Sequence, residues 1–149
     1  MPRLILLVAL ALSAAGAAGG ELLRVTAAWV SPTVPGQPVG AAYIQLRSEQ
    51  DATLVKIESD VSEAAEIHQM TTEYEVMRMR RLDQVALPAG QTVGLSPGGR
   101  HVMLVDLRQP LKVGDTVRLT LTLRLKDGRT VQETVMVPVA RMARHGGHP

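Results

Sequence analysis

A strictly alternating run near the end of the chain is the feature that most restricts its fold. Over residues 116–125, TVRLTLTLRL, every second side chain is Val or Leu, and the intervening side chains are Thr or Arg. Strand side chains point alternately to the two faces, so this run predicts a half-buried antiparallel strand. Asp127 and Gly128 then supply the residues of a tight turn, and residues 130–140, TVQETVMVPVA, are predicted to return as the second strand of a hairpin.

The rest of the chain shows the same organisation in shorter segments. Runs of strand-forming residues alternate with turn signals, such as SPTVPGQPVG at 31–40 and the polar turn TTEY at 71–74. Many short strands at this spacing predict an all-β Greek-key sandwich or barrel. Hydrophobic residues make up 46% of the 149, with no Phe and one Trp, so Val, Leu and Ile are expected to fill the core of one domain.

The first 20 residues have the composition of a secretory signal peptide. Arg3 precedes an apolar run over residues 4–12, and small residues follow over 13–20. The apolar run is short for a transmembrane helix, and an uncleaved anchor is the alternative interpretation. We therefore expect an exported, periplasmic protein whose mature chain begins near Glu21.

Composition argues against several classes of function. The sequence has no cysteine, which excludes disulfides, thiolate metal sites, thiol catalysis, type-one copper centres and lipoprotein acylation. Its 16 basic and 14 acidic residues are mixed along the chain and aromatic residues make up 2%, so we expect no nucleic-acid binding. Ser96 has no base near it in sequence, and Glu63, Glu66 and Glu73 fit exposed positions better than acid–base roles, so we expect no enzyme.

Histidine and methionine recur two residues apart. The pairs are His68 with Met70, Met77 with Met79, and His101 with Met103. Both members of such a pair lie on one face of a strand, so the pairs can converge where strands meet. Thioether sulfur is a soft, uncharged ligand and imidazole suits copper, so the mixture favours copper(I) over zinc, calcium or magnesium. The competing interpretation is that Met packs the core and His lies on the surface.

The spacing of four of these residues resembles the motif of the PCuAC-type periplasmic copper chaperones, H-x10-M-x21-H-x-M. Ten residues separate His68 from Met79, twenty-one separate Met79 from His101, and Met103 closes the motif. The likeness extends over about residues 25–139. It implies a cupredoxin-like fold for a domain of residues 21–140, with a copper(I) site near the surface formed by these four side chains.

The resemblance also implies partners. Members of this family are thought to hand copper to cytochrome oxidase, chiefly at its dinuclear copper-A centre, often alongside a Sco-type thiol protein. We therefore expect a monomeric carrier with the copper-A subunit and a Sco-type protein as partners. Met70 and Met77 stand outside the motif, and they are interpreted either as accessory thioethers or as core residues.

Residues 141–149 are expected to form a flexible tail containing Met142, His145 and His148. Some family members have a His/Met-rich extension that binds copper(II), so a copper(II) site and a solvated end without metal are both open for this tail. Two alternatives to a chaperone are also open, namely a copper storage or resistance protein and a metal-free exported β-sandwich module.

Overall fold

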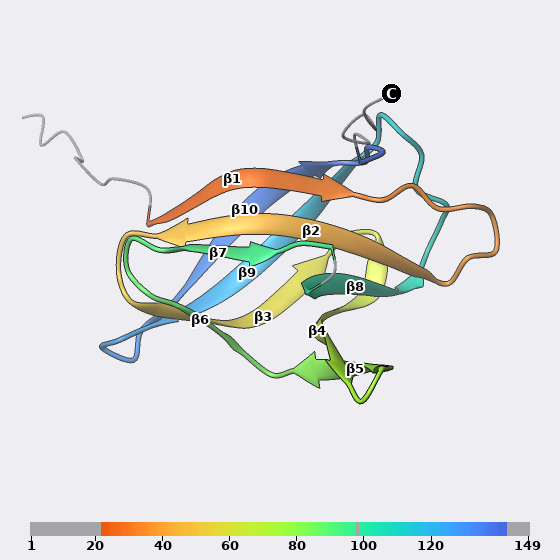
Figure 1. The fold of residues 1–149 in the computed structure, drawn as a ribbon. Helices are drawn as coiled ribbons and strands as arrows, with labels where there is room; N and C mark the ends of the chain where they lie inside the picture. Colours follow the sequence, from red (N-terminus) through yellow and green to blue (C-terminus); the bar gives the residue numbers. More distant parts are fainter. Residues whose placement is uncertain (1–21, 98, 143–149) are drawn as a thin grey trace, which may run out of the picture.

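The structure is a computed structural model that describes residues 22–97 and 99–142 (Figure 1). Ten strands account for most of these residues, and no helix among them is long and apolar enough to cross a membrane. The strands are β1 (Leu23–Val30), β2 (Val39–Ser48), β3 (Ala52–Ser59), β4 (Ser62–Glu73), β5 (Val76–Leu82), β6 (Val85–Leu87), β7 (Thr92–Leu95), β8 (Arg100–Leu107), β9 (Thr116–Leu125) and β10 (Thr130–Pro138).

The strands form one antiparallel sheet that curls into a nearly closed barrel. Its order is β1-β2-β8-β4-β3-β9-β10, while β5 pairs with β4, β6 with β3 and β7 with β2. The two ends of this order meet at a parallel bridge between Val30 and Val139, where the Ala140 amide donates to the Val30 carbonyl at 3.0 Å. Strands distant in sequence are thus neighbours, as Greek-key connections require, and the predicted all-β fold class is confirmed.

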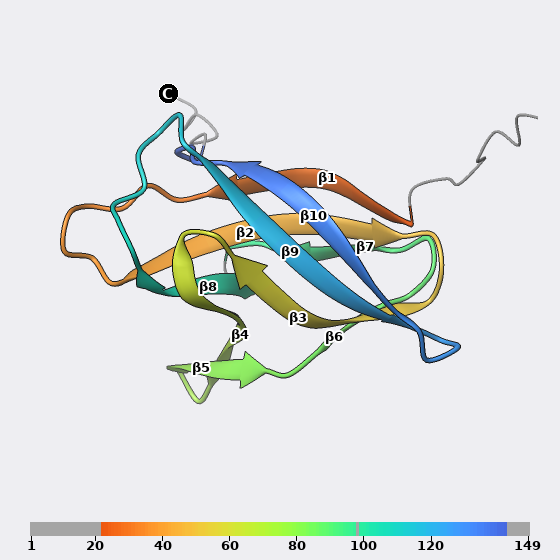
Figure 2. The ribbon, with the colours of Figure 1, turned by 180° about the vertical axis from the view of Figure 1, so that it is seen from behind.

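The β9–β10 hairpin forms as the alternation predicts, and Figure 2 shows the two strands side by side across the barrel. Val117 and the leucines at 119, 121, 123 and 125 are all buried, whereas Arg118 and Arg124 are exposed. Gly128 has a φ of 90°, which L side chains adopt with difficulty. Burial of one complete face explains why this pair of strands could be predicted from sequence alone.

The same alternation in β2, β4 and β8 separates a core face from an outer face. Ala42 and Ile44 of β2, Ile67 of β4 and Val102 and Leu104 of β8 point into the aliphatic core. Their sequence neighbours necessarily point outward. The predicted copper ligands of β4 and β8 are among those neighbours, so the fold places them on the outside of the barrel.

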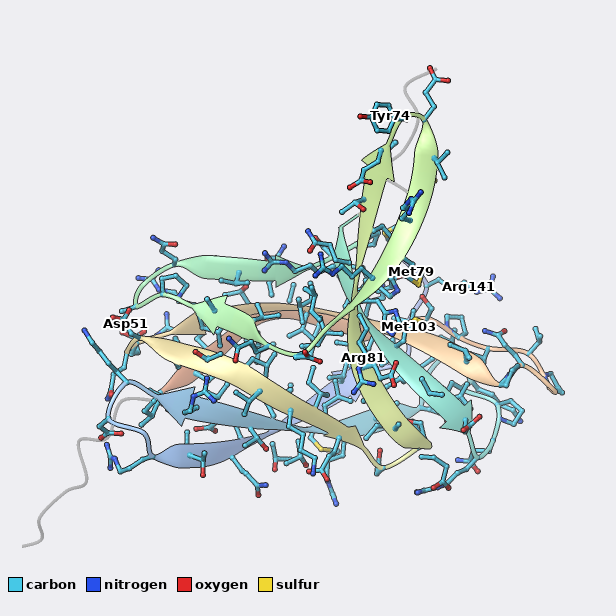
Figure 3. The ribbon with its side chains drawn as sticks, turned by 90° about the horizontal axis from the view of Figure 1, so that it is seen from below. Asp51, Tyr74, Met79, Arg81, Met103 and Arg141 are labelled. Atoms are coloured by element: carbon cyan, nitrogen blue, oxygen red, sulfur yellow. The ribbon has the colours of Figure 1, made fainter. Side chains whose placement is uncertain are left out.

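A hairpin formed by the end of β4 and by β5 projects from the barrel, with Tyr74 at its tip (Figure 3). Glu73 pairs with Val76, so the turn consists of Tyr74 and Glu75, whose φ values are 50° and 64°. The prediction of a turn at residues 71–74 is therefore wrong in position. The β-branched residues Thr71 and Thr72 continue the strand instead.

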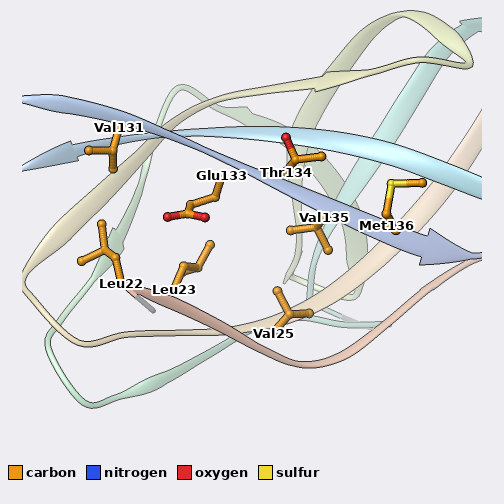
Figure 4. A pocket seen from close by; sticks show the side chains of 8 residues that line it. All are labelled: Leu22, Leu23, Val25, Val131, Glu133, Thr134, Val135 and Met136. Carbon is orange, nitrogen blue, oxygen red and sulfur yellow. The ribbon is translucent and has the colours of Figure 1, made fainter. Parts of the chain in front are cut away.

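A groove runs between β1 and β10, where the barrel is not closed by pairing (Figure 4). None of the predicted copper ligands contributes to its lining, which comprises Leu22, Leu23, Val25, Val131, Glu133, Thr134, Val135 and Met136. The predicted signal peptide of residues 1–20, together with His145 and His148 of the predicted tail, lies outside the described residues.

Candidate metal centre

His68 and His101 lie directly opposite each other on the neighbouring strands β4 and β8. Their ring centroids are 6.1 Å apart and the ring planes differ by 30°. Metal–imidazole bonds of about 2.0 Å, plus about 1.1 Å from nitrogen to ring centre, allow two imidazoles on one ion to have centres up to about 6.2 Å apart. The observed spacing lies just within this limit, which applies when the two nitrogens are on opposite sides of the ion, so the two rings are close enough to share one metal ion.

The two motif methionines lie on the same outer face as the histidines. Met103 is two residues from His101 along β8, and Met79 of β5 pairs with Met70, which is two residues from His68 along β4. Figure 3 shows Met79 along the projecting hairpin and Met103 close to the base of that hairpin. The four predicted ligands thus come from three adjoining strands.

Glu66 lies on this face as well and contacts two cationic or potentially cationic side chains. Nε2–H of His68 donates to Oε2 of Glu66 at 2.9 Å, and Nη1 of Arg81 is 3.4 Å from Oε1. The hydrogen bond from His68 is the main reason that the pKa of Glu66 lies below its usual value, and the charge of Arg81 acts in the same direction. Glu66 is consequently an ionised hydrogen-bond acceptor at neutral pH.

The surroundings of both imidazoles are compatible with metal binding. Nδ1 of His68 is buried and has no hydrogen-bond partner. The pKa of His101 is lowered, first by burial and then by the nearby His68, while a hydrogen bond with the Gly99 backbone acts in the opposite direction. Neutral imidazole is the form that binds metal, so the lowered pKa favours metal binding at His101.

A row of aromatic rings leads across the sheet to the histidines. The centroids of Trp29 and Tyr43 are 5.0 Å apart, and those of Tyr43 and His101 are 6.4 Å apart. Tyr43 thus lies beside the His101 ring, and Trp29 packs on Tyr43. Sequence reasoning did not find Trp29, Tyr43 or Arg81 as neighbours of the site, because their positions follow from the order of β1, β2, β8, β4 and β5 in the sheet.

The side chains brought together are suited to copper(I). In the part of the chain that the structure describes, no three His, Asp or Glu side chains are arranged to hold a metal ion. The donors on the outer face are two imidazoles together with thioethers, and soft thioethers are ligands for copper(I). The structure thus fits the metal that the sequence pattern predicts.

The accessory methionines differ from one another in position. Met70 pairs directly with Met79 and lies on the ligand face, partly buried. Met77 pairs with Thr72 nearer the hairpin tip and is 65% exposed, so the interpretation of Met77 as a core residue is wrong. Met142 follows the last strand and is exposed.

Comparison with known proteins identifies the family. The model of the family described as "Putative lipoprotein LpqE-like" matches residues 23–139. The chain belongs to the LpqE-like family. One relative, "Putative lipoprotein Lxx21020" of Leifsonia xyli subsp. xyli (strain CTCB07), is 30% identical over 118 residues, covering 78% of this chain and 69% of the relative. "Uncharacterized protein RP573" of Rickettsia prowazekii (strain Madrid E) is 34% identical over 98 residues, covering 62% of this chain and 54% of that protein.

Solved structures connect this LpqE-like chain to PCuAC domains. The solution structure of apo-DR1885 from Deinococcus radiodurans has 31% identity and a TM-score of 0.57, covering 97% of both chains. The apo PCuAC domain from PmoF1 has 22% identity and a TM-score of 0.61, covering 80% of this chain and 94% of that domain. The predicted PCuAC-type relationship and the cupredoxin-like fold are therefore confirmed.

Proposed function

We propose that this protein is an exported copper(I) chaperone that delivers copper to the copper-A centre of cytochrome oxidase. The observation that carries the proposal is the cross-strand pair of His68 and His101, with Met79 and Met103 on the same outer face. Copper-bound relatives support the choice of metal. They are CuI-DR1885 from Deinococcus radiodurans, at 33% identity and a TM-score of 0.56, and the copper-bound PCuAC domain from PmoF2.

Unequal exposure of the ligands suits a carrier rather than a permanent metal site. His68 and His101 are 16% and 9% exposed, whereas Met79 on the hairpin is 52% exposed. An incoming acceptor ligand therefore reaches the Met79 side of the copper first. Copper(I) would leave by stepwise ligand exchange in which the exposed Met79 thioether is displaced before the better-buried imidazoles.

The acceptor chemistry gives the transfer its direction. A copper-A centre holds copper through bridging thiolates, and thiolates bind copper(I) more strongly than thioethers and neutral imidazoles. The acceptor cysteines must be reduced, which is the role we assign to a Sco-type thiol protein, since this chain has no cysteine. The signal-peptide pattern of residues 1–20 and the lipoprotein names of the family model and of one relative support export to the periplasm.

Two measurements test the proposal. Copper(I) titration of the mature protein with X-ray absorption readout should give one equivalent with a mixed nitrogen and sulfur shell. Mixing the loaded protein with a reduced, folded apo copper-A domain should then move the copper and leave the donor empty. Failure to bind copper(I) would favour a metal-free module, whereas copper that stays on the donor at equilibrium would favour storage or resistance.

A further inference from the structure

The orientation of the His68 ring is fixed by a residue that does not belong to the copper motif. Glu66 precedes His68 by two residues on β4, so both side chains point to the outer face. Their 2.9 Å hydrogen bond joins the carboxylate to Nε2, the ring nitrogen farther from the backbone. This bond leaves Nδ1 as the nitrogen that is not used within the protein.

The 2.9 Å contact between the Glu66 carboxylate and Nε2 indicates which ring nitrogen carries the proton. An ionised carboxylate only accepts hydrogen bonds, so Nε2 must carry the proton that is donated to it. In a neutral imidazole the other nitrogen then has a free lone pair, and Nδ1 of His68 is indeed buried and has no hydrogen-bond partner. Burial of such an unpaired polar atom costs free energy, which a bound metal ion would recover.

We propose that Glu66 is a positioning residue that holds His68 in the Nε2–H tautomer, so that Nδ1 is the atom that binds copper(I). This inference rests on the proposed function for the identity of the metal. Carboxylates commonly orient metal-bound histidines through the second ring nitrogen, and this contact fixes the tautomer and raises the basicity of the ligating nitrogen. Glu66 would not itself bind copper(I), because a hard carboxylate oxygen is a poor ligand for a soft ion.

Arg81 makes the arrangement more rigid. It pairs with His68 across β4 and β5, and its Nη1 lies 3.4 Å from the Glu66 oxygen that His68 does not use. The carboxylate is therefore held between a guanidinium and an imidazole, with one oxygen for each. Met103 occupies the position opposite Glu66 on β8, which places the carboxylate within the ligand cluster rather than beside it.

The first test uses the metal-free protein and long-range 15N–1H NMR of the imidazoles. Wild-type His68 should show one tautomer, protonated at Nε2, and Glu66→Gln should retain it because an amide oxygen can still accept. Glu66→Ala should shift His68 toward a mixture of tautomers. Glu63→Ala is the matched control, since Glu63 lies on the same strand but is 65% exposed and pairs with Arg108. Protonation of wild-type His68 at Nδ1 would overturn the inference.

The second test uses the copper(I)-loaded protein, which is diamagnetic and gives sharp spectra. Loading should move the His68 Nδ1 resonance and leave Nε2 protonated, and Glu66→Ala should weaken copper(I) binding by about 10- to 100-fold. A copper-induced shift at Nε2, or unchanged affinity in Glu66→Ala, would refute the inference. Absence of copper(I) binding in a wild-type protein with the expected tautomer would instead refute the proposed function.

Discussion

The candidate ligands differ in burial and in the number of contacts that fix their side chains. The ring of His101 is almost buried between Tyr43 and His68, and the ring of His68 is bonded to Glu66. Met79, in contrast, stands on a projecting hairpin with half of its surface exposed. Fixed nitrogen donors can keep a preformed site, while adaptable thioethers can be exchanged without disturbing the barrel. This combination serves a protein that must bind a metal ion and also release it.

Removal of a single motif ligand should weaken copper(I) binding without unfolding the protein. We expect His101→Ala and Met103→Leu each to lower copper(I) affinity at least tenfold. Loss of a side chain that only orients a metal ligand already weakens metal binding by about 10- to 100-fold, and loss of a ligand itself should weaken it at least as much. Competition with a copper(I) chelator measures the effect. Met136→Leu is the control, because Met136 is also exposed but lies on β10 away from the site. Wild-type affinity in both ligand variants would contradict the assignment.

Sequence spacing was sufficient to select candidate ligands that the structure places on one outer face, but it was not sufficient to predict their environment. His68, Met79, His101 and Met103 were predicted because each pair shares a strand face and because the gaps match a known motif. Glu66 was interpreted as an exposed carboxylate, but its side chain is only 26% exposed. Its position two residues before His68 was an available signal, yet burial on this face depends on the neighbouring strands β5 and β8.

At the scale of elements, local signals decided which hairpin was predicted correctly. The β9–β10 turn contains Asp127 and Gly128, whose conformational preferences fit a tight turn. The β4–β5 turn instead places Tyr74 and Glu75 at positive φ, where neither residue is favoured. The polar segment TTEY indicated a turn in this region but not its position, which is set by the pairing of β4 with β5.

The β4–β5 turn should be open to stabilisation. We expect the double change Tyr74→Asn with Glu75→Gly to raise the free energy of unfolding by about 1 kcal/mol, because Asn-Gly adopts positive φ at both turn positions with little strain. Urea unfolding measures the change. Glu73→Gly, at the neighbouring strand position, should lower stability, since glycine weakens a strand. A loss of stability in the double variant would show that the native turn is not strained.

A hydroxyl on β9 provides a second test of the elements. Oγ1 of Thr122 is buried without a hydrogen-bond partner, and an unsatisfied buried polar group destabilises a fold by about 1–3 kcal/mol. Thr122→Val keeps the shape of the side chain and removes this hydroxyl, so thermal and urea unfolding should show higher stability. Thr120→Val, on the same face of β9, serves as the comparison and should change stability less. A less stable Thr122→Val protein would indicate that the hydroxyl is satisfied in solution.

At the scale of the whole molecule, the site depends on a contact between distant parts of the chain. β8 inserts between β2 and β4, and only this insertion brings His101 opposite His68. Alternation could predict the strands and their buried faces, but strand order arises from long-range packing that no short segment encodes. The likeness to the copper-chaperone motif groups His68 and Met79 with His101 and Met103 in one predicted site, and this grouping does not require knowledge of the strand order.

The predicted tail can be tested apart from the barrel. The Ala140 amide donates the hydrogen bond to Val30 that joins the two ends of the sheet, so a protein truncated after Ala140 keeps this closure. The truncation removes Met142, His145 and His148, and imidazole nitrogens are good ligands for copper(II). We therefore expect the truncated protein to keep one copper(I) equivalent and to lose a weak second equivalent of copper(II), detected by electron paramagnetic resonance titration. The full-length His145→Ala, His148→Ala variant should lose the same equivalent. Equal copper(II) stoichiometry in all three proteins would leave the tail without a role in metal binding and assign all copper to the barrel face.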